Sequence, residues 1–167
     1  MMWWHPGSKC YDEFKVGDRF VTPGRTVTES DIQAFVRLSG DYGPLHTNDL
    51  EAEQGPFGRR VCHGLLSMSM LTGLFMGRLG IFDATGLALL AMENLRFRKP
   101  VFVGDTIRAG MQVESMRESK SQPDFGVVVF RIEGIKQDGI CFLDCEWHEW
   151  VAKTSWKAQH LHEFSNV

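Results

Sequence analysis

Residues 63–79 decide the fold of this chain and read HGLLSMSMLTGLFMGRL. Apolar side chains occupy nearly every face of a helix built from this segment, so the helix has to be enclosed on all sides. The apolar part, Leu65 to Leu79, is shorter than the roughly 20 residues needed to cross a bilayer. The segment therefore predicts a buried central helix, and a curved sheet wrapped around it is the natural partner.

The second half of the chain predicts that sheet. We expect strands over residues 89–97, 105–116, 125–135 and 141–148. The second of these strands alternates cleanly, with Ile107, Ala109, Met111 and Val113 on one face and polar residues on the other. Asp138-Gly139 is typical of a hairpin turn and makes the last two strands antiparallel neighbours. The expected class is α+β, with a long central helix wrapped by a curved antiparallel β-sheet.

The length of 167 residues predicts one domain. We assign residues 1–24 to an N-terminal arm, residues 25–152 to the domain proper and residues 153–167 to a C-terminal tail or short helix. Thr28, followed by acidic residues and a helical apolar spacing, predicts a capped helix that ends at Ser39-Gly40. Residues 41–62 show little periodicity and are expected to form a long loop, which in a compact domain is usually functional.

The composition restricts the kinds of partner that the chain can bind. The 18 basic and 21 acidic residues give a net charge of −3. The sequence therefore lacks the basic stripe that nucleic-acid binding requires. The apolar N-terminal residues are too few for a signal peptide, and no stretch is long enough to span a membrane. The four cysteines lack the spacing of a disulfide framework. We therefore expect reduced thiols in a cytoplasmic protein that binds neither nucleic acid nor membrane.

Two clusters carry candidate chemistry. Asp41 and His46 flank a Gly-Pro turn, which can hold a carboxylate and an imidazole against one water molecule. His63-Gly64 stands at the start of the apolar helix, where the Gly64 backbone N–H can stabilise an oxyanion. Together they indicate water chemistry beside a carbonyl. Capping, turn formation and helix entry are the purely structural alternatives for the same residues.

Other kinds of site have weaker support. Cys141 and Cys145 fall on the same face of an expected strand, which favours packing over zinc binding. The chain contains no Gly-x-Ser-x-Gly elbow, phosphate-binding loop or dinucleotide fingerprint. We therefore expect no cofactor and no metal ion.

Three motifs occur in order along the chain: SGDYGPLH at residues 39–46, VCHGLL at 61–66 and FRKPVFVGDT at 97–106. Together they resemble the MaoC-like, (R)-specific enoyl-CoA hydratase family of hotdog-fold proteins, over about residues 16–151. The resemblance implies a hotdog fold, dimers of two such units and an acyl-CoA thioester substrate. It also implies that Asp41 and His46 activate water and that Gly64 is the oxyanion donor.

The chain departs from that family at two positions. Gly43 stands where the family usually has asparagine, so the side chain that commonly braces the loop is absent. The loop has to rely on Tyr42 or Pro44 for that support instead. Thr72 stands where many relatives carry serine, and its extra methyl group narrows the expected acyl pocket. Arg98 is a candidate for the phosphates of coenzyme A. The expected substrate-binding residues are Tyr42, Pro44, His63, Thr72 and Arg98.

The resulting hypothesis is a homodimeric hydratase of trans-2-enoyl-CoA thioesters that forms (R)-3-hydroxyacyl-CoA, or the reverse dehydratase. Two alternatives stay open. A hotdog acyl-CoA thioesterase commonly has a catalytic acid on or near the central helix, and residues 65–76 contain none. The other alternative is a non-catalytic acyl-CoA-binding module.

Overall fold

A computed structural model describes residues 8–161 of the chain. Its strands are β1 (Arg19–Val21), β2 (Arg25–Thr26), β3 (Gly86–Phe97), β4 (Thr106–Glu118), β5 (Phe125–Lys136) and β6 (Cys141–Ala152). Its helical elements are η1 (Tyr11–Glu13), α1 (Glu29–Ser39), α2 (Pro44–Thr47), α3 (Asp49–Glu53), α4 (Gly64–Thr72), η2 (Gly73–Arg78) and α5 (Thr154–Leu161).

The strands form one antiparallel sheet in the order β1-β4-β5-β6-β3, with β2 also paired to β4. The predicted alternation in β4 is confirmed, since Ile107, Ala109, Met111 and Val113 are all at most 4% exposed. The hairpin at Asp138-Gly139 is also confirmed, because Gly139 has a left-handed φ of 82° between β5 and β6. The expected α+β class is therefore correct.

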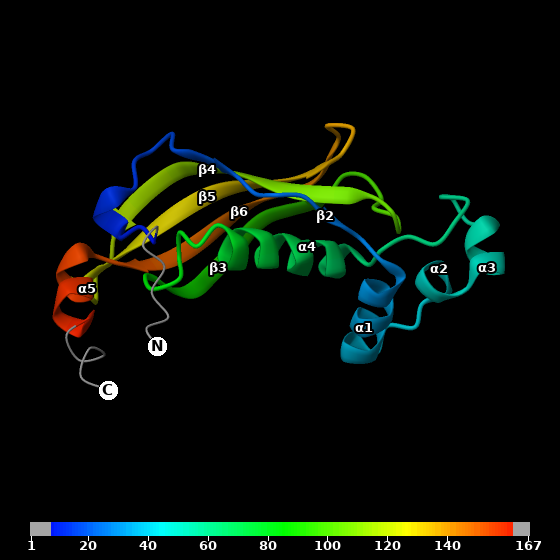
Figure 1. Cartoon of the computed structure of the whole chain (residues 1–167), viewed down its shortest axis with the longest axis horizontal. Coiled ribbons are helices and arrows are strands. Elements are labelled where there is room, and N and C mark those ends of the chain that lie inside the picture. The colour runs from blue at the N-terminus through cyan, green and yellow to red at the C-terminus, as the bar shows by residue number, and fades with distance from the viewer. Residues whose placement is uncertain (1–7, 162–167) are drawn as a thin grey trace.

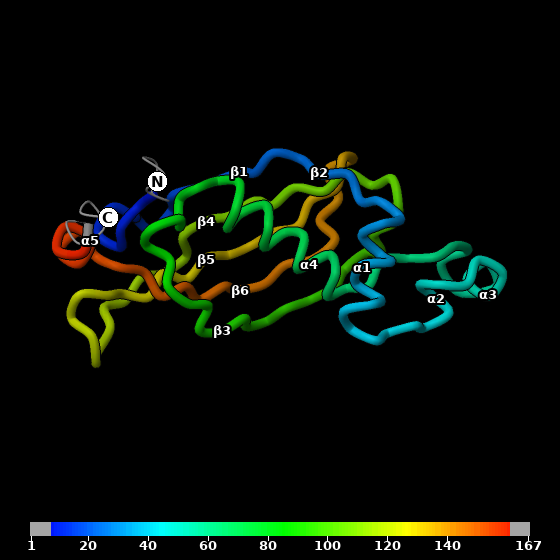
Figure 2. Tube along the Cα trace, turned by 60° about the horizontal axis from the view of Figure 1, so that its bottom comes forward, coloured from blue at the N-terminus to red at the C-terminus, as the bar shows by residue number. Residues whose placement is uncertain are grey.

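The central helix lies along one face of the sheet, as Figures 1 and 2 show. It begins as α4 and continues as the π-helical segment η2. Leu66, Leu71 and Phe75 are among its buried residues. Within the described part of the chain, no helix combines the length and the apolar character that crossing a membrane requires.

The expectation that this helix is enclosed on every side is wrong for the single chain. Residues 65, 69, 73 and 77 are exposed, and Leu65 has 58% of its surface accessible. Their spacing of four places them along one stripe of a helix. The physical reason is that one sheet covers the helix from one side only, so this stripe faces outward.

The predicted capping of α1 is confirmed. The Thr28 hydroxyl accepts from the Asp31 N–H at 3.3 Å, and the Asp31 carboxylate accepts from the Thr28 N–H at 2.8 Å. Gly40 ends the helix with a left-handed φ of 74°. The chain therefore leaves α1 with Asp41 as its next residue.

The prediction of one long loop over residues 41–62 is wrong for residues 44–47 and 49–53, which form α2 and α3. Pro44 suits the first position of α2, where no N–H is needed. The Asn48 side chain accepts from the N–H groups of Leu50 and Glu51 and so caps α3. These local hydrogen bonds and backbone preferences substitute for apolar periodicity, and the two helices lie at one end of the molecule (Figure 1).

Part of the predicted N-terminal arm joins the sheet and the core. β1 pairs with β4, and the side chains of Cys10 and Phe14 are at most 4% exposed. α5 falls within the segment predicted as a tail or short helix. Residues 1–7 and 162–167 lie outside the described residues, and the boundaries of the three regions stay predictions.

Candidate active site

Three side chains from separate elements meet at one end of the central helix. Asp41 follows the C-cap of α1, His46 lies in α2, and His63 is the N-cap residue of α4. One nitrogen or carboxylate oxygen of each lies within 4.8 Å of those of the other two. The structure therefore brings together Asp41 and His46, as the sequence predicted, and adds the side chain of His63.

The hydrogen bond of His46 defines its tautomer. Its Nδ1 lies 2.7 Å from the carbonyl oxygen of Val61. A carbonyl oxygen can only accept, so Nδ1 carries the proton and Nε2 of the neutral ring has a free lone pair. His46 is thus arranged to accept a proton at Nε2.

The Asp41 carboxylate is held through one oxygen. Oδ1 accepts from the N–H of Gly43 at 3.1 Å, and the Asp41 N–H donates to the Ser39 hydroxyl at 3.2 Å. The side chain is 55% exposed. Oδ2 lies 3.8 Å from Nε2 of His63, beyond hydrogen-bond distance, and remains free to contact water.

The His63 ring is buried among the other two residues. It is 3% exposed and stacks on His46 with ring centroids 3.7 Å apart and an interplanar angle of 25°. Its Nε2 donates to the carbonyl oxygen of Asp41 at 3.1 Å. Burial lowers the pKa of His63, and the nearby His46 lowers it further. The ring is therefore favoured in its neutral form.

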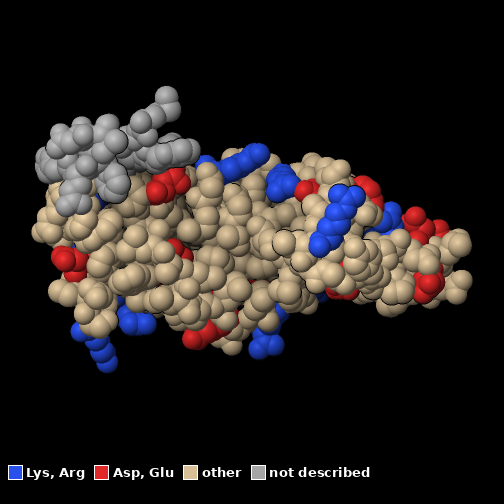
Figure 3. Space-filling model, turned by 90° about the horizontal axis from the view of Figure 1, so that it is seen from below, with Lys and Arg blue, Asp and Glu red and all other residues tan. Residues whose placement is uncertain are grey.

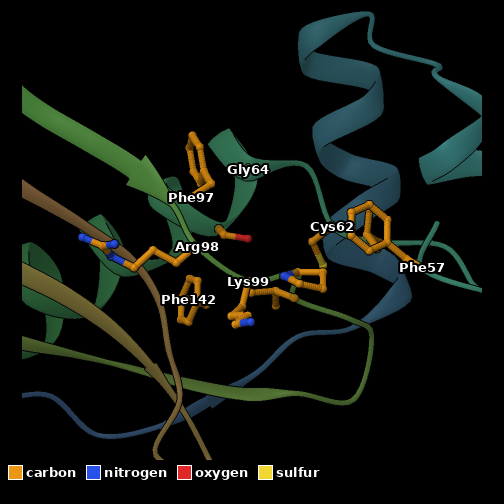
Figure 4. Close-up of a pocket in the computed structure, with 11 residues that line it drawn as sticks. Phe57, Cys62, Gly64, Phe97, Arg98, Lys99 and Phe142 are labelled. Atoms are coloured by element: carbon orange, nitrogen blue, oxygen red, sulfur yellow. The ribbon is translucent and has the colours of Figure 1, made fainter.

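Gly64 opens α4 beside a pocket of about 230 Å³. The first N–H of a helix has no partner within the helix, and it lies at the positive end of the helix dipole. No acceptor within residues 8–161 engages the Gly64 N–H. The pocket is shown in Figure 4 and is lined by Phe57, Val61, Cys62, Gly64, Ser67, Phe97, Arg98, Lys99, Pro100, Val101 and Phe142.

Arg98 lines this pocket but has a protein partner. Its Nη2 donates to Asp144 at 2.9 Å, and Arg131 contacts the same carboxylate at 3.3 Å. Arg98 and then Arg131 lower the pKa of Asp144. In Figure 4 the Arg98 side chain extends away from Cys62 and Phe57. Lys99 is the neighbouring cation on the pocket wall.

The cysteine in the pocket is a poor nucleophile. Burial raises the pKa of the Cys62 thiol to about 12, so the reactive thiolate is scarce at neutral pH. All four cysteines have free thiols, as the sequence predicted. The Cys62 thiol is therefore a weaker candidate for chemistry at this end of the helix than Asp41 or His46.

Two groups of side chains have the spacing of metal ligands: Asp41, His46 and His63, and on the sheet Glu93, Glu146 and His148. In the first group the histidine rings stack, so their in-plane lone pairs run side by side rather than converging on one ion. In the second group Glu146 already accepts from Asn94 at 2.8 Å, and Glu93 is 58% exposed. The arrangement of the first group favours proton transfer.

The predicted site residues are spread out relative to this pocket. The predicted oxyanion donor Gly64 and the predicted substrate-binding residue Arg98 line it. Its lining residues do not include Asp41, His46, Tyr42, Pro44, His63 or Thr72. Tyr42 is 66% exposed, and the Thr72 hydroxyl donates to the Met68 carbonyl oxygen at 3.1 Å. The roles of these residues in binding stay predictions.

Sequence reasoning missed the aromatic lining of the pocket. Phe57, Phe97 and Phe142 come from three distant segments. Phe97 stands at the head of the third motif, which is the signal that could have pointed to it. Phe57 and Phe142 have no comparable signal, because only the folded chain brings them to Gly64.

The central helix packed along one face of an antiparallel sheet, with an acid, an imidazole and a free helix N-terminus at one end, defines the class as an α+β hotdog protein. A Mycobacterium tuberculosis protein whose structure is described as a double hotdog fold superposes with a TM-score of 0.74 at 19% identity, over 90% of this chain and 46% of that chain. A model of the MaoC like domain matches residues 13–133. The chain therefore belongs to the MaoC-like domain family.

Curated relatives support this assignment. Protein MaoC of Klebsiella aerogenes is 43% identical over 104 residues, which cover 62% of this chain and 30% of that protein. The (R)-specific enoyl-CoA hydratase of Rhodospirillum rubrum is 32% identical over 110 residues, which cover 66% of this chain and 73% of the relative. The chain thus matches less than a third of the length of one relative and about three quarters of the other.

Proposed function

We propose that the chain hydrates trans-2-enoyl-CoA thioesters to (R)-3-hydroxyacyl-CoA, or catalyses the reverse dehydration. The observation that carries this proposal is the placement of three groups. Oδ2 of Asp41 and Nε2 of His46 are free for one water molecule, and the free N–H of Gly64 is one residue beyond His63. The relative from Rhodospirillum rubrum is named as an (R)-specific enoyl-CoA hydratase.

In the proposed reaction, water lies between Asp41 and His46. Its hydroxyl bonds to C3 of the enoyl group, one of these side chains takes a proton, and a proton is delivered to C2. Negative charge develops on the thioester oxygen, where the Gly64 N–H and the α4 dipole stabilise it. Each positioned proton transfer contributes about a hundredfold to ten-thousandfold, and one oxyanion donor about 3 kcal/mol.

The character of the pocket supports an acyl thioester. Phe57, Phe97 and Phe142 supply apolar walls beside Gly64, as a thioester and the adjoining acyl carbons require. Arg98 is already paired with Asp144, so Lys99 is better placed to meet a phosphate of coenzyme A without breaking an ion pair. We therefore assign the phosphate contact to Lys99 ahead of the predicted Arg98.

We propose that the active form is a homodimer formed through β3. This strand is an edge of the sheet, so its outer backbone groups are available for pairing. Leu87, Leu89, Leu90 and Met92 on it are each 41–51% exposed. Figure 3 shows that much of the underside, the side of the sheet on which Figure 1 places α4, carries few charges. A second copy supplies a matching strand and covers these apolar surfaces.

The decisive experiment follows the enoyl-thioester absorbance of crotonyl-CoA in the presence of the purified protein. Loss of absorbance without release of free thiol, and formation of the (R)-alcohol, is the expected result. Release of free coenzyme A would instead identify a thioesterase. Binding of crotonyl-CoA with no change in absorbance over hours would identify a non-catalytic binding module.

A further inference from the structure

The His63 side chain has no part in the proposed proton transfers, yet it contacts both residues that do. It is 3% exposed, so its ring faces protein on nearly every side. One edge donates to the Asp41 carbonyl oxygen, and one face stacks on His46. Phe35 of α1 lies near it as well, with ring centroids 5.0 Å apart.

From these contacts we propose that His63 is a positioning residue. As a neutral ring with its proton on Nε2, His63 holds Asp41 and His46 in place relative to each other. The inference rests on the proposed function, because it concerns the same site. It gives His63 a role through its neighbours rather than a contact with the substrate.

The hydrogen bond from the His63 ring to Asp41 specifies its tautomer. Since the Asp41 carbonyl oxygen can only accept, Nε2 carries the proton. Nδ1 is buried and has no hydrogen-bond partner within residues 8–161. A proton on Nδ1 would leave a buried donor without an acceptor, which is unfavourable. Asp41 and His46 are the titratable groups that act on this ring.

The neutral ring matters whenever the proposed proton transfers place a second proton on the His46 ring. The imidazolium then formed lies against the uncharged face of His63, rather than against a second positive charge. The same stack restrains rotation of the His46 ring, which is otherwise held by one hydrogen bond to Val61. The hydrogen bond from Nε2 of His63 anchors the backbone that carries Asp41. Loss of the stack or of this hydrogen bond therefore loosens Asp41 and His46 but leaves both side chains present.

Two variants separate these contacts. His63→Phe retains a flat ring for stacking and loses the N–H donor, whereas His63→Gln retains a donor of similar reach and loses the stack. Each is expected to lower kcat for crotonyl-CoA hydration about 10-fold to 100-fold and to change KM less than about threefold. The shared control is His160→Gln, because His160 also stacks on a ring and bonds a backbone carbonyl, at the opposite end of the molecule. It is expected to retain full activity.

Nitrogen NMR of labelled histidine gives a second readout that needs no turnover. We expect wild-type His63 to show one neutral tautomer with the proton on Nε2 at neutral pH, and the neutral form of His46 to carry its proton on Nδ1. In His63→Gln the His46 signals are expected to average toward both tautomers. Unchanged His46 signals, a protonated His63 at neutral pH, or full activity in both variants would overturn the role of His63. An inactive wild type with the expected NMR spectra would refute the proposed function and leave the His63 assignment standing.

Discussion

Phe97 lies directly over Gly64: a Cβ atom added to Gly64 would be 2.9 Å from Cε1 of the Phe97 ring. A side chain at position 64 would displace that ring, which is half-exposed and can move. We expect Gly64→Ala to cost about 1 kcal/mol of stability and to lower hydration at least about 10-fold, because both the oxyanion donor and the pocket wall shift.

A double variant checks the steric cause. In Gly64→Ala/Phe97→Ala the added methyl group has no ring to displace, so the loss of stability is expected to be less than the sum of the single losses. Chemical denaturation of the four proteins measures this. If the stability losses of the two single variants add up exactly in the double variant, the contact with Phe97 does not restrict which residue position 64 can accept.

Removal of either water-binding side chain is expected to abolish most of the activity without unfolding the chain. Asp41→Asn and His46→Ala should each reduce the rate of crotonyl-CoA hydration by several hundredfold, on the order of one positioned proton transfer. Their melting temperatures should barely move, because Asp41 is more than half-exposed and His46 is only partly buried. Asp83→Asn, at an exposed carboxylate elsewhere, is the matched control. Retained activity in either variant would remove that residue from the mechanism.

The ion pair of Asp144 should make stability depend on pH at the acidic end. Arg98 and Arg131 lower the pKa of Asp144 below its ordinary value of 3.8. A carboxyl group with a lowered pKa stabilises the fold above its unfolded-state pKa, and this contribution disappears as pH falls through the folded-state value. Asp144→Asn is therefore expected to cost about 1 kcal/mol at pH 7, since Arg98 is half-exposed, and progressively less below pH 4.

Urea unfolding of both proteins at pH 7 and pH 3 measures that difference. Glu118→Gln is the control, because Glu118 forms an exposed ion pair with Lys153 and is 70% accessible. Its replacement should alter stability little at either pH. An Asp144 effect of equal size at both pH values would contradict the electrostatic cause.

Glu149 should make stability depend on pH with the opposite sign. The side chain is 1% exposed, accepts from Trp147 Nε1 at 2.8 Å, and burial raises its pKa above 4.5. A carboxyl group with a raised pKa contributes most below its unfolded-state value, and the contribution is lost as pH rises through the folded-state value. Glu149→Gln, which keeps an acceptor for Trp147, should melt about 3 °C above wild type at pH 8 and close to it at pH 4. A variant that is less stable than wild type at pH 8 would show that the ionised form is the stabilising one.

The proposed dimer can be tested at the β3 edge. Leu90→Glu introduces a charge on this edge strand, where Leu90 is 51% exposed, and should convert the dimer to a 19.0 kDa monomer. Val21→Glu is the matched control, because Val21 is 61% exposed on the opposite edge strand β1. Light scattering after size exclusion measures the mass. A wild-type monomer, or a dimer disrupted only by Val21→Glu, would rule out assembly through β3.

Local sequence determined much of the framework. Thr28 caps α1 through a residue three positions away, and Asp138-Gly139 turns the chain between neighbouring strands, so both features depend on nearby atoms. The alternation in β4 identified its buried face for the same reason. The short helices α2 and α3 escaped prediction because caps and a proline, rather than apolar periodicity, define them.

The sequence by itself also placed Asp41, His46 and Gly64 as candidates, since short motifs carry residue types and spacing. Only the tertiary structure decided their environment. Three contacts join residues from different parts of the fold: the hydrogen bond from His46 to Val61, the stack of His46 on His63, and the position of Phe97 over Gly64. The exposed stripe of α4 likewise depends on how far one sheet reaches around the helix. Periodicity reports which residues prefer burial, whereas packing between distant segments fixes what each of them contacts.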